Sequence, residues 1–235
     1  RYSQGSQNDG WSLSGMAYQG KWLSTDQIPQ RAIDDGRLDR FGSLDSSTGG
    51  KVFRYSLSGE WAARGQNTQA RANAWLLRSG LDLWSNFTYC LDDFANTGTC
   101  SQGDQFLHRE RRMDGGFATS YQRADRWGRF EILNSIGLQG RQDRINPVGL
   151  YKTAGREMMS TTRADRVTQR SLSLWAQSEL SWTDWLRTVT GVRGDMYDFT
   201  VDANQNANSG AVGDQMVTPK FSVIFGPWRR SELYL

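Results

Sequence analysis

The sequence predicts an all-β chain, an antiparallel segment of a transmembrane β-barrel with about nine strands. Three observations predict this class: apolar and polar residues alternate with a period of two, long and short connections alternate, and tryptophans gather beside the short connections. No apolar run approaches the ~20 residues that a membrane helix needs. Any membrane span in this chain is therefore expected to be a strand.

The alternation is clearest between residues 53 and 61. Phe53, Tyr55 and Leu57 are apolar, whereas Arg54 and Glu60 at the even positions are polar. A strand places successive side chains on opposite faces, so this pattern indicates one apolar and one polar face. The same pattern predicts strands at residues 11–22, 51–64, 68–89, 106–123, 127–142, 167–181, 186–201 and 217–225, with a ninth starting near Arg229.

The connections between these strands alternate in length. Long polar loops are expected at residues 23–50, 90–105, 143–166 and 202–216, and short turns at residues 65–67, 124–126, 182–185 and 226–228. Outer-membrane barrels have short periplasmic turns and long extracellular loops, so this order is typical of them. In the first long loop, Pro29 and Gly36 flank residues 30–35 and predict a short helix there.

Composition narrows the class further. The mean hydropathy of −0.67 suits a soluble protein. A membrane barrel can also have a low mean hydropathy, because only one face of each strand contacts lipid and the other face is polar. The chain has 28 basic and 25 acidic residues and a net charge of +3, which indicates a mixed polar surface rather than a nucleic-acid partner. His108 is its single histidine, so a histidine-based metal site or catalytic triad is not expected, and no catalytic residue or cofactor is predicted.

Alternation alone does not say which face meets water, and a soluble barrel would bury the apolar face. Strands long enough to cross a bilayer (~9–11 residues), charged side chains on the polar face, and six of the ten tryptophans beside short turns favour a membrane barrel. Lipid-facing side chains are then expected at Phe53, Tyr55, Leu57, Phe130, Ile132, Leu172 and Leu174. Lumen-facing side chains are expected at Arg54, Glu60, Arg129, Glu131, Glu179, Arg193 and Asp195.

Two loop features bear on chemistry. Cys90 and Cys100 lie close together in a polar segment, which predicts a disulfide and an oxidising compartment. Acidic pairs such as Asp92 and Asp93 lack the spacing of a metal site and are interpreted as solvated loop residues. The basic cluster of Arg109, Arg111 and Arg112 suits either an anionic ligand or lipopolysaccharide, or a solvated or lumen-facing charge run, and the latter is favoured.

Several segments resemble one family. Residues 24–29 (STDQIP) with 40–45 (RFGSLD), residues 81–93 with 103–106 (GDQF), and residues 218–228 (TPKFSVIFGPW) are similar to loops and strands of TonB-dependent outer-membrane receptors. The resemblance runs from about Trp11 to Leu235. It implies the middle part of a barrel of about 22 strands, in the outer membrane of a Gram-negative bacterium.

The resemblance also implies a function: active uptake of a scarce, bulky nutrient such as a ferric siderophore, cobalamin or an oligosaccharide. The implied partners are outer-membrane lipid, a small-molecule ligand such as a metal chelate, and TonB, which would act through a plug domain and a TonB-contacting box. Neither the plug nor the box is found here, so residues 1–235 are expected to be part of one barrel domain of a longer polypeptide. The alternatives are a passive porin-like or structural barrel and, with less support, a soluble β-barrel binding module.

Overall fold

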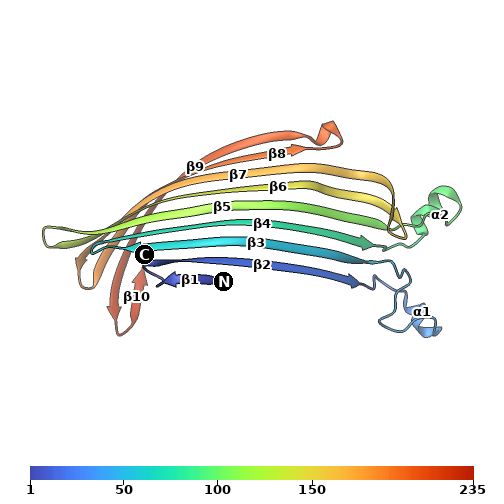
Figure 1. Ribbon diagram of the computed structural model, residues 1–235, viewed down its shortest axis with the longest axis horizontal. Coiled ribbons are helices and arrows are strands. Elements are labelled where there is room, and N and C mark those ends of the chain that lie inside the picture. Colours follow the sequence, from blue (N-terminus) through green and yellow to red (C-terminus); the bar gives the residue numbers. More distant parts are fainter.

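The chain forms one antiparallel sheet whose strands follow one another in chain order. A computed structural model describes residues 1–235 and contains ten strands, each paired only with its neighbours in the sequence (Figure 1). The strands are β1 (Tyr2–Gly5), β2 (Gly10–Leu23), β3 (Gly49–Arg64), β4 (Thr68–Ser85), β5 (Phe106–Trp127), β6 (Phe130–Ala154), β7 (Glu157–Thr183), β8 (Leu186–Asp202), β9 (Gly210–Trp228) and β10 (Ser231–Tyr234). The helices are α1 (Gln30–Asp34), α2 (Leu91–Thr97) and the 3₁₀ turn η1 (Asn206–Asn208).

The all-β antiparallel barrel segment expected from the sequence is confirmed, with one strand more than expected. The additional strand is β1, which has only four residues and pairs with the start of β2. Four residues are too few for a period-two pattern to stand out. The expected helix in the first long loop is present as α1. None of the helices has the length and apolar character needed to cross a bilayer.

The two kinds of connection lie at opposite ends of the sheet. Figure 1 shows α1 and α2 at one end, and the short β3–β4 and β5–β6 turns lie at the other. Residues 24–48 and 86–105 form the two long loops, and residues 203–209 form a shorter one. We call the end with the long loops the outer rim and the opposite end the inner end.

The prediction of a third long loop is wrong. Residues 143–166 belong almost entirely to β6 and β7, which have 25 and 27 residues and meet in a two-residue turn at Gly155 and Arg156. Both faces of this extension carry polar residues, and the pairing register shifts between Ile145 and Val148. Bulges and polar residues on both faces break the period-two pattern, so the sequence shows no strand signal there.

Two inner turns lie later in the chain than expected. The turn predicted at residues 124–126 is strand, and the chain reverses instead at Gly128 and Arg129, where Gly128 takes a φ of +61°. The turn predicted at residues 226–228 lies at Arg229 and Arg230. The turns at residues 65–67 and at Asp184 and Trp185 fall within the predicted ranges. The ends of these strands are polar because the strands extend beyond the part in which apolar and polar residues alternate. In the sequence such polar ends resemble turns.

The sheet has a small cluster of buried apolar side chains near the outer rim. Trp84, Leu107 and Tyr151 pack together from β4, β5 and β6, with Ala164 of β7 beside them. Elsewhere many large apolar side chains are exposed, as expected for a single sheet layer with no second layer against it, although Ile145, Val189 and Ile224 are buried. The backbone ladder therefore holds most of the sheet, with 142 of 164 backbone hydrogen bonds inside helices and strands.

Candidate ligand-facing surface and outer rim

The pairing register sorts the side chains of all long strands onto two chemically different faces. Leu57 opposes Leu76, and Leu138 opposes Leu174, so these leucines project to one side of the sheet. Ser173 opposes Asp195 on the other side. We call the first side the apolar face and the second the charged face.

The two faces differ in exposure in a way that indicates the sense of curvature. On the charged face, Asp114, Asp143 and Asp195 are buried although no second layer covers them, the last at 3% exposure. On the apolar face, Leu57 and Leu174 are more than half exposed. Side chains converge on the concave side of a curved sheet and spread on the convex side, so the charged face is the inner side of the curve.

The predicted face residues separate cleanly with one exception. All seven residues expected to face lipid lie on the apolar face, and six of the seven expected in the lumen lie on the charged face. The exception is Arg129, which is in no strand. It occupies the β5–β6 turn, and its guanidinium carbon lies 5.0 Å from the centre of the Phe130 ring. Arg129 is therefore assigned to neither face, because β5 continues past the expected turn.

A network of fixed charges crosses the charged face from β4 to β6. Asp114 accepts a hydrogen bond of 2.8 Å from the indole Nε1 of Trp75 and forms an ion pair with Arg141. Arg141 also donates through Nε to Asp143 at 2.8 Å, and Nη1 of Arg112 lies 3.7 Å from Asp143. These partners hold one another in place. They give the inner side of the curve a polar surface with preset donors and acceptors.

A second group of charges lies on β7 and β8. The hydroxyl of Ser173 donates to Asp195 at 2.6 Å, and Arg193 pairs with the same carboxylate at 2.8 Å. Nearer the inner end, Arg187 pairs with Glu179 at 3.2 Å and with Glu232 of β10 at 2.9 Å. The charged face is thus neutralised locally, with most of its arginines beside a carboxylate.

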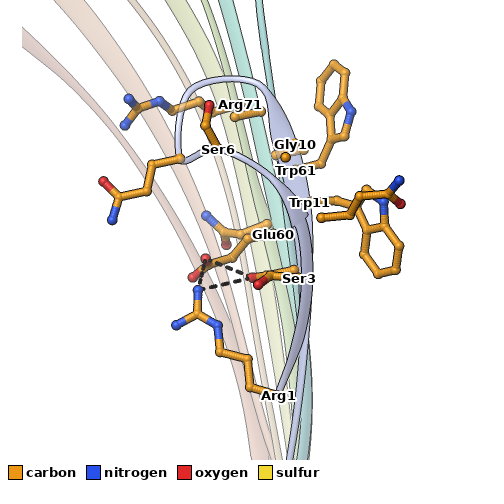
Figure 2. A pocket seen from close by; sticks show the side chains of 15 residues that line it. Arg1, Ser3, Ser6, Gly10, Trp11, Glu60, Trp61 and Arg71 are labelled. Carbon is orange, nitrogen blue, oxygen red and sulfur yellow. Dashed lines mark hydrogen bonds and ion pairs between the residues drawn. The ribbon is translucent and has the colours of Figure 1, made fainter.

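At the inner end, the β1–β2 turn bounds a cleft of about 610 Å³ on the charged face. Figure 2 shows Arg1 reaching toward Glu60, while Trp11 and Trp61 project to the other side of the sheet. Nη2 of Arg1 lies 3.8 Å from Glu60, and the Ser12 hydroxyl donates to Glu60 at 3.3 Å. Glu60, expected in the lumen, therefore lines a polar cleft.

The outer rim is organised around the buried side chain of Gln105. Its amide nitrogen donates to Asp45 at 2.9 Å and to the Ser47 hydroxyl at 2.6 Å, both in the first long loop. Its amide oxygen accepts from Thr153 at 2.9 Å and from the backbone N–H of Arg156 at 2.8 Å. One side chain thus joins both long loops to the β6–β7 turn. Its sequence context is an ordinary polar loop, so no sequence signal identified this role.

Arg156 continues the same connection from the β6–β7 turn. Its Nε donates to the carbonyl oxygen of Ser47 at 2.6 Å. Its guanidinium carbon lies 4.8 Å from the ring centre of Trp84, and Nζ of Lys51 lies 5.6 Å from that ring. Both cations are thus close enough to the buried indole for cation–π attraction, which stabilises these contacts. Asn86 adds a hydrogen bond of 2.8 Å to Asp45.

The second long loop is closed on itself by two aspartates. Asp93 accepts hydrogen bonds from the backbone N–H groups of Ser101, Gln102 and Gly103 at 2.9, 2.7 and 2.9 Å. In return Asp104 accepts from the N–H groups of Asp92 and Asp93, which belong to the first turn of α2. These bonds satisfy helix donors that have no partner within the helix.

The ionisation of these loop acids follows from their partners. The backbone N–H groups of Gln102, Gly103 and Ser101 hold the pKa of Asp93 below its ordinary value. Burial alone would raise the pKa of Asp45, but hydrogen bonds from Ser47, Asn86 and Gln105 outweigh it and lower the pKa. Both loop acids are therefore charged at neutral pH.

Cys90 and Cys100 flank α2 and are joined by a disulfide, with their Cα atoms 5.7 Å apart. No group of three or more histidine, cysteine or acidic side chains lies together to hold a metal ion. Phe41, Leu91 and Phe94 point outward from the two long loops and are at least 60% exposed. The rim therefore combines a hydrogen-bonded polar base with exposed apolar side chains.

Comparison with known proteins identifies the family of this chain. The sequence matches the family described as TonB dependent receptor-like, beta-barrel, over residues 1–234. The chain belongs to this family. Its members are outer-membrane transporters and receptors rather than enzymes. Comparison with curated protein sequences finds no match.

Solved structures of TonB-dependent receptors share the fold. The ferric citrate transporter FecA in its unliganded form matches 97% of this chain with a TM-score of 0.66 and 11% identity. The open form of the ferric-catecholate import receptor Fiu from E. coli K12 matches 96% with a TM-score of 0.64 and 10% identity. The ferric yersiniabactin uptake receptor FyuA from Yersinia pestis matches 92% with a TM-score of 0.52 and 11% identity. The chain spans 36%, 43% and 32% of these three structures.

Proposed function

We propose that the chain forms part of the barrel wall of an outer-membrane receptor for TonB-coupled uptake of a bulky nutrient. The observation that carries the proposal is the separation of the two faces in a member of this family. The apolar face would contact lipid, and the charged face, on the inner side of the curve, would line the lumen. The ten strands would be one part of a larger closed barrel, because an open edge in lipid leaves ladder groups unpaired.

We infer that the ligand belongs to the ferric-chelate class. The support is the names of the three structural neighbours, a ferric citrate transporter, a ferric-catecholate import receptor and a ferric yersiniabactin uptake receptor. The exposed Phe41, Leu91 and Phe94 at the rim suit a ligand with flat or apolar parts. The fixed ion pairs below them offer charged partners to such a ligand once it has entered.

Coupling to TonB would act through a plug domain and its box. A wide barrel of this family holds a plug rather than an open channel, and moving a plug requires work. In this proposal the chain supplies part of the barrel wall, and we propose no enzymatic activity for it.

Uptake by the full-length protein tests the proposal. Cells are given radiolabelled ferric citrate, a ferric catecholate, cobalamin or an oligosaccharide, with and without TonB. We expect TonB-dependent accumulation of a ferric chelate. Accumulation of cobalamin or oligosaccharide instead would overturn the ligand class but keep the receptor. Uptake that is unchanged without TonB, with steady open conductance in a planar bilayer, would identify a passive pore.

A pair of variants tests the assignment of the charged face. Arg112→Gln removes a charge from the charged face, and Arg123→Gln removes one from the apolar face of the same strand near the inner end. We expect the first to reduce uptake severalfold and the second to leave it unchanged at equal protein levels. Equal effects of the two variants would contradict the assignment.

A further inference from the structure

A row of polar side chains crosses the apolar face near the inner end, from β5 to β8. Arg123 opposes Asn134, and Asn134 opposes Ser178 in the next strand. Thr190 opposes Ser178 from β8. We call these four residues the polar row. The neighbouring row toward the outer end is apolar and consists of Tyr121, Ile136, Ala176 and Val192.

The polar row lies toward the inner edge of the apolar face. Arg123 opposes Thr68, the first residue of β4, and precedes Gly128 of the β5–β6 turn by five residues, which is roughly 10–15 Å for tilted strands. Phe130 and Trp182 lie still nearer the inner end, with their ring centres 5.3 Å apart. Aromatic side chains gather where a membrane meets water. The polar row therefore lies at the level proposed for the inner head groups.

A groove of about 610 Å³ runs along the polar row on this face. All four residues of the row line it, together with Tyr121, Asp125 and Ala176. The small side chain of Ala176 lies between Ile136 and Val192 of the neighbouring strands, which leaves room over β7. The groove therefore places polar atoms next to apolar side chains, as the boundary between a lipid head group and its acyl chains does.

Most polar atoms of the row have no hydrogen-bond partner in the chain. The side chains of Asn134, Ser178 and Thr190 form no hydrogen bond. Arg123 donates only through Nε, to one carboxylate oxygen of Asp125 at 3.0 Å. The two terminal nitrogens of Arg123 and the other oxygen of Asp125 remain open. Unpaired polar groups that face lipid cost free energy, so these groups require a partner from the membrane.

The order of the charges along β5 matches one kind of head group. Toward the inner end, the same face of β5 presents Tyr121, then the cation Arg123, then the anion Asp125. A zwitterionic phospholipid of the inner leaflet presents its acyl chains, its phosphate and its ammonium in the same order. An anionic phospholipid carries a phosphate but no ammonium, so it leaves Asp125 without a partner.

We propose that the polar row and Asp125 bind a phospholipid of the inner leaflet whose head group carries a phosphate and a primary ammonium, as in phosphatidylethanolamine. The terminal nitrogens of Arg123 bind the phosphate, and the ammonium donates to the open oxygen of Asp125. The hydroxyls of Ser178 and Thr190 donate to the remaining head-group oxygens. The acyl chains lie against the neighbouring apolar row. The inference rests on the proposed orientation of the two faces, and it adds a specific lipid site to it.

Native mass spectrometry of the full-length protein in a non-ionic detergent tests this site. The probes are phosphatidylethanolamine and phosphatidylglycerol with identical acyl chains, and water-soluble glycerophosphoethanolamine as a competitor. We expect phosphatidylethanolamine to bind roughly tenfold more tightly than phosphatidylglycerol, which lacks the ammonium. Glycerophosphoethanolamine at equal concentration should not compete, because the acyl chains contribute to binding.

Two pairs of variants locate the site. Asp125→Asn should bring the affinities for the two lipids within about twofold of each other, whereas Asp184→Asn in the β7–β8 turn should keep the preference. Arg123→Gln should weaken the binding of both lipids roughly tenfold. Its control Arg144→Gln, on the same face near the outer end, should change the binding less than about twofold.

The opposite outcomes would overturn the proposal. Equal binding of the two lipids by the parent protein would remove the ammonium contact, and equal losses in Arg123→Gln and Arg144→Gln would remove the location. Competition by glycerophosphoethanolamine would show a site for a soluble head group rather than for a lipid. If Arg123→Gln does not assemble, Asp125→Asn decides, and an unchanged lipid preference would reject the site.

TonB-dependent uptake is measured in parallel, so failure of the lipid site and failure of the receptor function remain distinguishable. The site lies on the face opposite the proposed lumen, so Arg123→Gln should lose lipid binding without a loss of uptake at equal protein levels.

Discussion

The membrane-spanning part of the sheet and its outer rim are stabilised in different ways. In the spanning part, the backbone ladder supplies the connections, and side chains decide mainly which face meets lipid or water. At the rim, backbone segments without ladder partners are joined by the buried side chains of Gln105 and Asp93 and by the half-buried side chain of Arg156. The difference teaches that the spanning part should be sensitive to which face a change falls on. The rim should be sensitive to the loss of individual polar atoms.

The largest expected effect comes from placing a charge on the apolar face. Leu57→Arg should cost about 2–4 kcal/mol near the bilayer midplane and impair assembly of the full-length protein. The neighbouring Ser56→Arg lies on the charged face and should be mild. Heat-modifiable mobility in gel electrophoresis and protein level in the outer membrane measure the difference. Equal effects, or the reverse order, would reverse the faces.

The disulfide of the second long loop comes next. Replacing Cys90 and Cys100 with serine should destabilise the loop by up to roughly 2–3 kcal/mol, since the closed loop is short and its chain entropy small. Intact mass after alkylation without reductant shows whether the bond forms in protein from the outer membrane. Two alkylated thiols in the unreduced protein would contradict it.

Loss of the Gln105 amide should loosen the rim as a whole. Gln105→Leu leaves the Thr153 hydroxyl and the N–H of Arg156 without a partner and removes one of the hydrogen bonds to Asp45, at a cost of about 1–3 kcal/mol for an unpaired buried group. Gln102→Leu, an exposed position in the same loop, is the matched control. Hydrogen exchange should rise in both long loops and in the β6–β7 turn in the first variant only. A rise confined to the loop that contains residue 105 would show that the rim is not one unit.

The smallest expected effect is a pH dependence of the second long loop. Because the pKa of Asp93 is lowered in the folded loop, its contribution is complete above the ordinary pKa of about 4 and is lost as the pH falls through the lowered value. Exchange at the amides of Ser101, Gln102 and Gly103 should therefore rise below about pH 4. Asp93→Asn should show faster exchange already at neutral pH. Asp92→Asn, whose side chain accepts none of these bonds, should behave like the parent protein.

The sequence predicted the parts of the molecule in which the alternation of apolar and polar side chains is regular. Between the inner turns and the outer rim, apolar and polar side chains alternate along the strands, and the expected face residues apart from Arg129 fall on the two opposite sides of the sheet. Nearer the outer rim, both faces of β6 and β7 carry polar residues, so the alternation disappears and the strands were taken for a loop. Gln105 and Asp93 could not be identified, because their roles depend on segments that only the fold brings together.

The neighbour-only strand order described above has a consequence for assembly and for evolution. Every ladder forms between segments adjacent in the chain, so the average sequence separation of contacts is low for an all-β protein, and folding can proceed by addition of one hairpin at a time. Gain or loss of a hairpin disturbs only the pairing at the point of change. Since barrel diameter grows roughly in proportion to strand number, such an event changes the circumference by a fixed step and leaves the remaining registers as they were.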